Sequence, residues 1–428
     1  MGACFSEMGH TVFGVGNESS AVRELNAGRA PVHEPQLEPM LLRNIKAGRL
    51  KFTTNYSEAL TDVEFVFVAI DTPVDYSDRP VLDVIFDTVT AIAEHRTGSI
   101  VLCVTAQVPV GTSERLLGII RRRKPTLDCD IAYIPEFLRL SEAVETFLRA
   151  DRFIIGTDNK IVAERVAELY IPLKRPVLLT KLRSAEMSKH ASNTFLATSI
   201  SFVNEISDIC EQVGADVSEV VAGMKLDQRI GPRAFLSPGL GFAGGTLGRD
   251  IRALQELGRE HGTGTTLLDA VAAVNRSRAE FVVKRLRQQF GSIGGLRIGV
   301  YGLTYKPGTS TLRRSIALEI IAQLVGADAR VAAFDPLADL SNSGPLPKFE
   351  TTSDPYEAAS GCDALLLLTE WNGIRELDWE RVCRSMRQPV FIDTRNFFDP
   401  ETMAGIGFVY MGVGRGASAA KALVAQGV

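Results

Sequence analysis

The stretch Phe65-Val-Phe-Val-Ala-Ile70 is a short apolar run, followed by the amphipathic segment Leu82–Glu94 and a second apolar run, Ser99–Val104. This spacing predicts a strand, a helix and a second strand parallel to the first. The alternation continues on both sides, with further strands predicted at Thr11–Val15, Ile131–Ile134 and Phe153–Gly156 and further helices at Ala21–Asn26, Gln36–Ala47 and Thr112–Arg123. The first third of the chain therefore predicts an α/β domain with a doubly wound parallel sheet, covered by helices on both faces.

The middle of the chain changes to a long helical period between Ala185 and about Gly223. Its apolar stripe comprises Met187, Ala191, Phe195, Ala197, Ile200, Val203, Ile206 and Ile209. The helix-favouring run Thr266–Gln289 continues this region. Such a long apolar helix is either a connector and dimerisation surface or a buried core helix.

A second α/β pattern follows, with strands predicted at Leu296–Gly302, Arg330–Phe334, Ala364–Leu368, Val390–Ile392 and Phe408–Met411 and a helix at Ile316–Val325. We therefore predict three domains, at residues 1–184, 185–290 and 291–428. The first and last are α/β, and the central one is helical.

Composition excludes several classes of function. The 428 residues carry a net charge of -4, whereas a nucleic-acid-binding surface usually shows a basic excess. The longest apolar runs, Phe65–Ile70 and Ala364–Leu368, are too short to span a bilayer. The six cysteines are scattered without a CxxC pair, which is typical of a cytoplasmic protein and predicts neither a disulfide framework nor a metal site.

Short motifs follow one another along the whole chain. The most informative is the glycine-rich stretch Pro238-Gly-Leu-Gly-Phe-Ala-Gly-Gly-Thr-Leu-Gly-Arg-Asp250. The others include Glu34-Pro35, Thr72-Pro73, Val108–Thr112, Pro135–Arg139, Ala185–Lys189, Asn204-Glu205, Asp227–Gly231, Gly302–Pro307, Asp335-Pro336 and Asp393–Asn396. In this order the motifs resemble those of the UDP-glucose/GDP-mannose 6-dehydrogenase family. The resemblance implies two Rossmann-like domains joined by a helical domain, NAD as cofactor, a nucleotide-sugar substrate and a homodimer.

The resemblance also assigns catalytic positions. Lys189 and Asn193 lie four residues apart, so both project from one face of the predicted helix. A cation and an amide suit the stabilisation of a developing oxyanion. Asp250 matches the carboxylate that acts with this pair in acid–base chemistry, and Glu136 matches a carboxylate near the reacting carbon. Thr246 stands where the family has its catalytic cysteine.

Binding residues are carried over in the same way. The expected substrate contacts are Phe137, Leu138, Arg229, Phe235, Gly239, Gly241, Phe242, Lys306 and Arg395. Glycines permit close backbone approach to a pyrophosphate, and cations suit phosphate or sugar oxygens. The expected cofactor contacts are Asn17, Thr72, Pro73, Gln107 and Arg313.

Three departures from the family pattern affect the chemistry. The hydroxyl of Thr246 is almost un-ionised at neutral pH, whereas a cysteine supplies a thiolate readily. Leu140 replaces a second family glutamate, and Gln107 replaces a threonine that helps to place a water. The residues that serve alcohol oxidation are therefore kept, while those that serve the later hydrolytic half of the reaction are changed.

The cofactor side departs as well. The segment Met1–His10 matches the helix that follows the family's glycine-rich turn, so the central strand and the turn before it are missing from this sequence. We expect either a start codon placed too late or a shortened chain; the alternative is a true loss of dinucleotide binding. Gly16 replaces the acid that binds the ribose diol, so NADP is not excluded.

These observations support three hypotheses. The first is two-electron oxidation of an alcohol on a nucleotide sugar, or redox-neutral epimerisation through a transient carbonyl, which needs no nucleophile. The second is the ordinary four-electron 6-dehydrogenase, which forms a uronic acid through Thr246 or through an aldehyde hydrate. The third is a non-catalytic nucleotide-sugar-binding protein.

Overall fold

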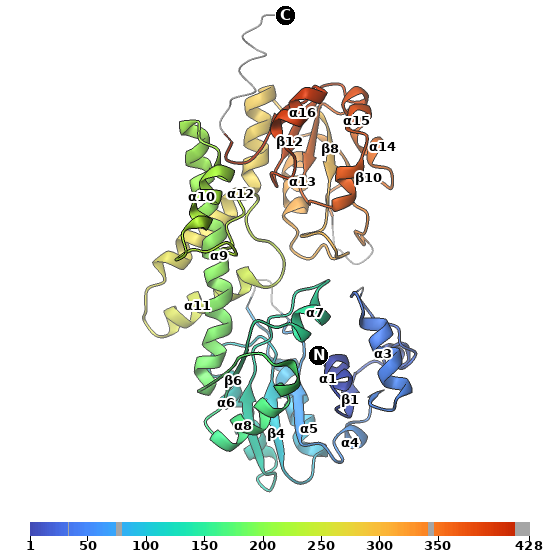
Figure 1. Ribbon diagram of the computed structural model, residues 1–428, viewed down its shortest axis with the longest axis vertical. Helices are drawn as coiled ribbons and strands as arrows, with labels where there is room; N and C mark the ends of the chain where they lie inside the picture. Colours follow the sequence, from blue (N-terminus) through green and yellow to red (C-terminus); the bar gives the residue numbers. More distant parts are fainter. Residues whose placement is uncertain (33, 74–78, 341–345, 416–428) are drawn as a thin grey trace, which may run out of the picture. The chain divides into compact units, whose positions relative to one another are not determined.

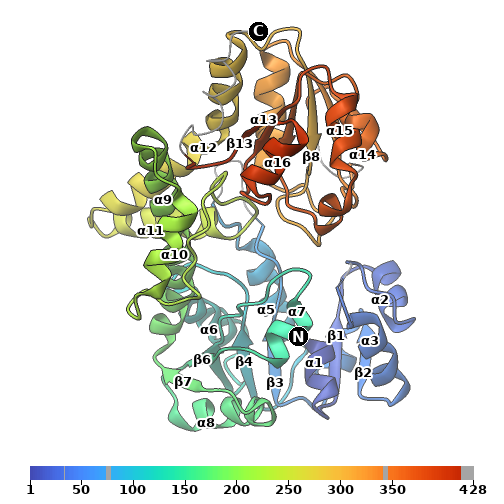
Figure 2. The same ribbon diagram turned by 45° about the horizontal axis from the view of Figure 1, so that its top comes forward.

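The computed structural model describes residues 1–32, 34–73, 79–340 and 346–415. The chain forms two compact units, Met1–Ser192 and Asn193–Val428. Figures 1 and 2 show both units, each with a sheet flanked by helices.

The first unit contains a five-stranded sheet in the order β3-β4-β5-β6-β7 and a separate pair, β1-β2. Their bounds are β1 Val12–Val15, β2 Leu50–Thr53, β3 Phe65–Val68, β4 Ile100–Val104, β5 Cys129–Tyr133, β6 Phe153–Gly156 and β7 Val177–Thr180. All neighbours are parallel except β5 and β6. The strands predicted from the sequence are confirmed, and β2 and β7 are additional.

Strand β4 shows why this fold forms. Its five residues are all buried, because its side chains alternate between two helix-covered faces. Ile100, Leu102 and Val104 belong to the core beneath one helical layer, whereas Val101 and Cys103 belong to the core beneath the other. A strand covered on both faces requires a continuous apolar run, which is the feature that the sequence displays.

Helices cover both faces of this sheet. One layer consists of α5 (Asp83–His95) and α6 (Thr112–Arg123). The other includes α1 (Gly2–Glu7), α3 (Leu37–Lys46), α7 (Ala143–Leu148) and α8 (Lys160–Glu168), with α2 (Ser19–Asn26) and α4 (Tyr56–Ala59) beside the strand pair. The doubly wound arrangement is thereby confirmed.

The strands of the first unit are divided between two sheets. The described residues pair β1 only with β2 and β3 only with β4, so β1 and β3 each have an edge without a strand partner among them. Helix α1 packs on both pieces, since it contacts β1 and its Phe5 ring lies 5.0 Å from that of Phe67 on β3. Unpaired parallel strand edges are unusual in the interior of a doubly wound sheet.

The second unit begins within a long helix. Helix α9 (Leu182–Val213) has 32 residues and crosses the boundary between the units, and α10 (Val217–Leu226), α11 (Leu247–Glu260) and α12 (Thr266–Phe290) follow. The single helical period predicted up to Gly223 is therefore wrong in one respect. The helix stops before Gly214, whose φ of 76° ends it in the left-handed region, and α10 starts anew at an Asp216 cap.

The remaining residues form a six-stranded parallel sheet in the order β10-β9-β8-β11-β12-β13. The strands are β8 Arg297–Tyr301, β9 Arg330–Phe334, β10 Glu350–Thr352, β11 Ala364–Leu367, β12 Val390–Asp393 and β13 Val409–Met411. Helices α13 (Ile316–Gly326), α14 (Pro355–Ala359), α15 (Trp379–Ser385) and α16 (Pro400–Ile406) accompany them. This is the second Rossmann-like sheet expected from the sequence.

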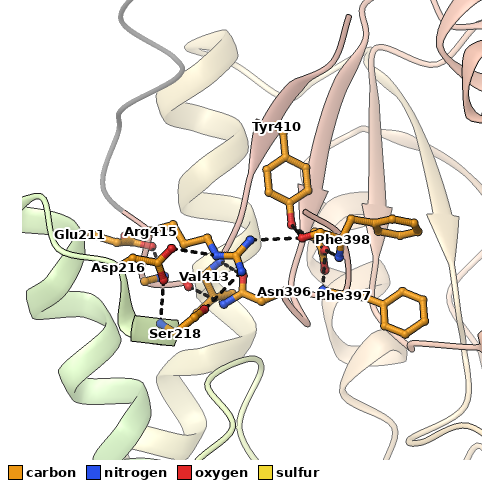
Figure 3. A network of polar contacts seen from close by, with 11 residues as sticks. Glu211, Asp216, Ser218, Asn396, Phe397, Phe398, Tyr410, Val413 and Arg415 are labelled. Carbon is orange, nitrogen blue, oxygen red and sulfur yellow. Dashed lines mark hydrogen bonds and ion pairs between the residues drawn. The ribbon is translucent and has the colours of Figure 1, made fainter. Parts of the chain in front are cut away.

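At the end of the described chain, polar contacts join this sheet to α9 and α10 (Figure 3). The Arg415 guanidinium lies 3.5 Å from an Asp216 carboxylate oxygen and donates to the Ser218 hydroxyl and the Phe398 carbonyl. The Gly414 amide donates to Glu211 over 2.9 Å. The second unit is therefore held together by polar contacts as well as by its apolar cores.

Buried Arg96 offers a test of the first unit's stability. Its guanidinium donates to the carbonyl oxygens of Leu60, Thr61 and Ser99 over 2.7–2.9 Å, so Arg96→Met would leave three acceptors without this donor. We expect the free energy of unfolding to fall by about 2–4 kcal/mol, measured by urea denaturation with circular dichroism. The exposed Arg165, paired with Glu64, provides the control, and Arg165→Met should change stability by less than about 1 kcal/mol. Equal free energies of unfolding for the two variants would contradict a stabilising role of the Arg96 hydrogen bonds.

Candidate active site

Lys189 lies in a buried polar cluster of the first unit. It projects from α9 with a side chain only 5% exposed, and its ammonium donates to the Glu136 carbonyl and lies 3.5 Å from the Glu136 carboxylate. The same ammonium sits 4.9 Å from the centre of the Phe137 ring. The Leu138 amide donates to the other Glu136 oxygen over 2.7 Å and orients that carboxylate. The structure thus brings together four of the residues expected from the sequence.

Asn193 and Asp250 form a second pair, within the other unit. The Asn193 amide nitrogen donates to an Asp250 carboxylate oxygen over 2.5 Å, and both side chains are buried. Asp250 lies in the first turn of α11, where the positive end of the helix dipole favours a carboxylate. Lys189 and Asn193 are four residues apart in the sequence of α9, Lys189 in the first unit and Asn193 in the second.

Thr246 occupies the N-cap of α11 and is exposed. Its hydroxyl makes no capping bond, and in the part of the chain that the structure describes no base is hydrogen-bonded to it. A serine- or threonine-type nucleophile requires such a base to remove its proton. The geometry therefore gives Thr246 none of the activation that a covalent role would need.

Buried polar side chains hold the glycine-rich loop. The Gly239 amide donates to Asn204 over 2.8 Å, while Arg278 donates to the Gly239 carbonyl over 3.1 Å. Arg278 is fully buried and paired with Asp208 at 2.7 Å. The Asn275 side chain bonds both the amide and the carbonyl of Phe242. These contacts fix the backbone of the loop in one conformation.

The loop lies against the carboxyl-end loops of the second sheet, within the same unit. The Gly244 amide donates to the Arg314 carbonyl, and Gly239 approaches the Thr394 carbonyl so closely that an added Cβ would lie 2.9 Å from it. Arg395 follows β12 and is held by the Leu368 carbonyl at 2.8 Å and by Glu370 at 3.2 Å. The carboxyl ends of parallel strands are where α/β sheets bind nucleotides.

Two aspartates shape these carboxyl-end loops. Asp335 accepts hydrogen bonds from the amides of Leu303 and Thr304 and so orients the segment that leads to half-buried Lys306. Asp393 accepts from the Tyr410 hydroxyl and from backbone amides, including that of Arg395. Burial raises the pKa of the Asp393 carboxyl, and these hydrogen bonds oppose the rise.

Other predicted binding residues are exposed. Phe235 is 49% exposed, and the Arg229 guanidinium is 89% exposed and paired with Asp227 at 2.6 Å. Arg313 is exposed in the loop before α13. Gly241 and Phe242 belong to the clamped loop described above.

The predicted cofactor residues of the first unit follow the carboxyl ends of their strands. Thr72, beyond β3, is buried and donates to the Gln107 carbonyl, beyond β4, over 2.8 Å; Pro73 follows it. Gly16 and Asn17 follow β1, where the Gly16 amide donates to the Thr53 carbonyl. Small and polar residues at this edge fit a dinucleotide, which would lie across the strand ends.

Sequence reasoning missed most of the residues that hold the site. Asn204 belonged to a recognised motif without an assigned role, whereas Arg278 and Asn275 lie in a helix-favouring run with no motif. A charged residue within a buried helical face was the only available signal for Arg278.

The fold and the site define a class: a dinucleotide-dependent oxidoreductase with two Rossmann-like sheets and a glycine-rich loop beside the second. Residues 1–174 match the NAD binding domain, 183–277 the central domain and 299–400 the UDP binding domain of the UDP-glucose/GDP-mannose dehydrogenase family. The chain therefore belongs to this family of NAD-dependent nucleotide-sugar dehydrogenases.

Individual relatives agree. The chain is 36% identical over 421 residues to the UDP-glucose 6-dehydrogenase of Rhizobium meliloti, covering 97% of this chain and 96% of the relative. It is 37% identical over 416 residues to UDP-glucose 6-dehydrogenase TuaD of Bacillus subtilis, covering 97% and 90%. The structure of a UDP-glucose dehydrogenase from Pyrobaculum islandicum superposes with a TM-score of 0.88 at 30% identity, covering 97% of this chain and 94% of that one.

The described residues form neither a membrane-spanning helix nor a metal-binding cluster. None of their helices is long and apolar enough to cross a membrane. Within the same residues, no group of histidine, cysteine and acidic side chains is arranged to hold a metal ion.

The glycine-rich loop provides a prediction with an internal control. Gly241 has a φ of 82°, and a Cβ there would lie 2.3 Å from the Asn275 side-chain oxygen, so Gly241→Ala should displace the clamp. We expect UDP affinity, measured by titration calorimetry, to fall about tenfold or more, equivalent to at least about 1.4 kcal/mol. Gly245→Ala, where a Cβ meets nothing within 4 Å, should leave affinity unchanged. Equal affinities would show that the clamp does not shape the nucleotide site.

Proposed function

We propose that this protein is a UDP-hexose 6-dehydrogenase. The observation that carries the proposal is the near full-length identity of 36–37% to UDP-glucose 6-dehydrogenases, together with a UDP binding domain. The buried acid, amide and cation of the α9 region supply the groups that alcohol oxidation requires.

In the proposed first oxidation, NAD held at the strand ends beside Thr72 and Gln107 would supply the hydride acceptor. Asp250 accepts the proton of the sugar hydroxyl, and the Lys189 ammonium stabilises the developing alkoxide. Asn193 holds Asp250 through its amide and fixes the direction of the free carboxylate oxygen. The product of this step is an aldehyde, and one hydride and one proton have left the alcohol.

The second oxidation cannot follow the thiol route, because residue 246 is a threonine. We propose that water adds to the aldehyde to form a hydrate, which would become the carboxylate by transfer of a second hydride to a second molecule of NAD and release of two protons. Glu136, one-third exposed beside Lys189, is the carboxylate placed to accept a proton from this water. This route assigns no covalent bond to Thr246, in keeping with its exposed and unactivated hydroxyl.

A second candidate function is favoured by the same threonine. Without a covalent intermediate the aldehyde is free to leave after one oxidation, or to receive the hydride back on its other face as an epimer. The changes at Gln107 and Leu140 support this outcome, since both positions serve the hydrolytic half of the reaction in the family resemblance.

The ratio of reduced cofactor to product distinguishes the two candidates. With UDP-glucose and NAD, the 6-dehydrogenase should yield two reduced cofactors per sugar and a product that gains one oxygen and loses two hydrogens, measured by absorbance and mass spectrometry together. A ratio of one, or an isomer without net reduction, would establish the second candidate instead.

Thr246→Ala should change neither the ratio nor the rate by more than about threefold, because no covalent step is assigned to that hydroxyl.

We also propose that the protein is a homodimer formed through α9. Phe195, Phe202 and Ile209 are seven residues apart on this helix and are 71%, 47% and 54% exposed. Apolar residues at heptad spacing form a continuous stripe on one helical face, which two copies can bury against each other.

The stripe can be tested by sedimentation. Phe202→Glu should convert a dimer to a monomer, because the new carboxylate would be buried in an apolar interface without a partner. Ile161→Glu, at a 67% exposed apolar position of α8, is the matched control and should remain dimeric. A wild-type monomer, or a dimeric Phe202→Glu variant, would exclude this interface.

A further inference from the structure

The first unit contains a fully buried carboxylate that the proposed chemistry does not use. Glu186 lies on α9 and has no solvent-exposed surface. One of its oxygens accepts a hydrogen bond from the Gly111 amide over 2.6 Å. The other accepts from the Ser113 amide over 2.9 Å and from the Ser113 hydroxyl over 2.7 Å.

These donors belong to the start of α6. Gly111 is the N-cap residue and Ser113 lies in the first turn, where backbone amides have no partner within the helix. The Glu186 carboxylate satisfies two of them and lies at the positive end of the helix dipole. A side chain of α9 therefore serves as the cap of α6, which leaves little freedom to slide one helix against the other.

Two further contacts fix the same turn of α9. His190, one turn after Glu186, is buried and places its Nε2 2.9 Å from the Val108 carbonyl oxygen. At Gly156, the last residue of β6, an added Cβ would lie 2.3 Å from the Ala185 Cβ, so the helix rests directly on the strand end. Together these contacts hold the start of α9 to the 108–113 loop and to the sheet.

Lys189 belongs to this fixed turn, between Glu186 and His190. Its ammonium contacts Glu136 and Phe137. The 108–113 loop directly follows Gln107, whose carbonyl accepts the Thr72 hydroxyl at the expected cofactor edge. The Glu186 carboxylate thus links the turn of α9 that carries Lys189 to the 108–113 loop, which follows the expected cofactor residue Gln107.

We propose that Glu186 is a positioning residue that sets the place of Lys189 relative to the 108–113 loop. It contacts no reacting atom and acts through the two elements that it joins. A displacement of about 1 Å between reacting groups can cost about 10²-fold in rate, so the loss of this link should lower kcat more than it weakens substrate binding. The catalytic part of this expectation rests on the proposed dehydrogenase function.

The variants are Glu186→Gln and Glu186→Asp. Glutamine keeps the shape but places an amide NH₂ group against amide donors of α6, and aspartate is one methylene too short to reach both Gly111 and Ser113. The matched control is Glu114→Gln, since Glu114 also joins α6 to α9, through an exposed ion pair with Arg183 at 2.6 Å. The control should behave as the wild type.

The first readout is the split between kcat and KM with UDP-glucose and NAD. For Glu186→Gln we expect kcat to fall about 10²-fold while KM changes less than about threefold, and for Glu186→Asp we expect an intermediate kcat. Wild-type kcat in a folded Glu186→Gln variant would overturn the proposal. A rise in KM with unchanged kcat would overturn it as well.

The second readout does not depend on activity. The rate at which an amine-acylating reagent labels Lys189, followed by peptide mass spectrometry, should rise several-fold in Glu186→Gln, with Lys124 of the same unit as the internal reference. If the wild type transfers no hydride from any UDP-sugar, the proposed function fails, and the labelling experiment alone tests the positioning role of Glu186. Equal labelling of Lys189 in the wild type and Glu186→Gln would then overturn the positioning role.

Should Glu186→Gln fail to fold, Ser113→Ala removes one of the three hydrogen bonds and keeps the buried charge. It should shift both readouts in the same direction by a smaller factor. No shift in either readout would count against the proposal.

Discussion

The contact between the Lys189 ammonium and Glu136 is the interaction on which the candidate site of the first unit depends. Lys189 lies on α9 with a side chain only 5% exposed, and a buried ammonium is costly unless a carboxylate or other acceptors surround it. The Glu136 carboxylate lies 3.5 Å away and the Phe137 ring 4.9 Å away, so the cation is paired and oriented. In the second unit, Asn193 and Asp250 form a buried pair of their own.

Buried polar groups in this protein are retained where they fix backbone. Asn204 accepts from the amide of Gly239 and Arg278 donates to its carbonyl, while Asp393 accepts from amides that follow β12. Removing such groups from water is costly unless their hydrogen bonds are replaced. Arg278 and Asp393 each have several partners, and these bonds define the loops at the carboxyl ends of the second sheet.

Thr246 carries a hydroxyl where the family resemblance places a thiol. The loop around it keeps the glycines and the terminal Asp250, and its backbone is clamped at Gly239 and Phe242. A hydroxyl without a neighbouring base is not a nucleophile at neutral pH. The loop thus keeps its clamped backbone and Asp250, while among the described residues no base is hydrogen-bonded to the hydroxyl at position 246.

The sequence by itself determined the α/β class, two sheets separated by long helices, and the order of the motifs. Each of these follows from local periodicity, as in the continuous apolar run of β4. The separate β1-β2 pair and the partners of Arg278 and Glu186 were decided only by the tertiary structure. Glu186 lies 73 residues from Ser113 in sequence, and no local pattern can predict which distant amide a buried carboxylate will meet, because that depends on how the elements pack.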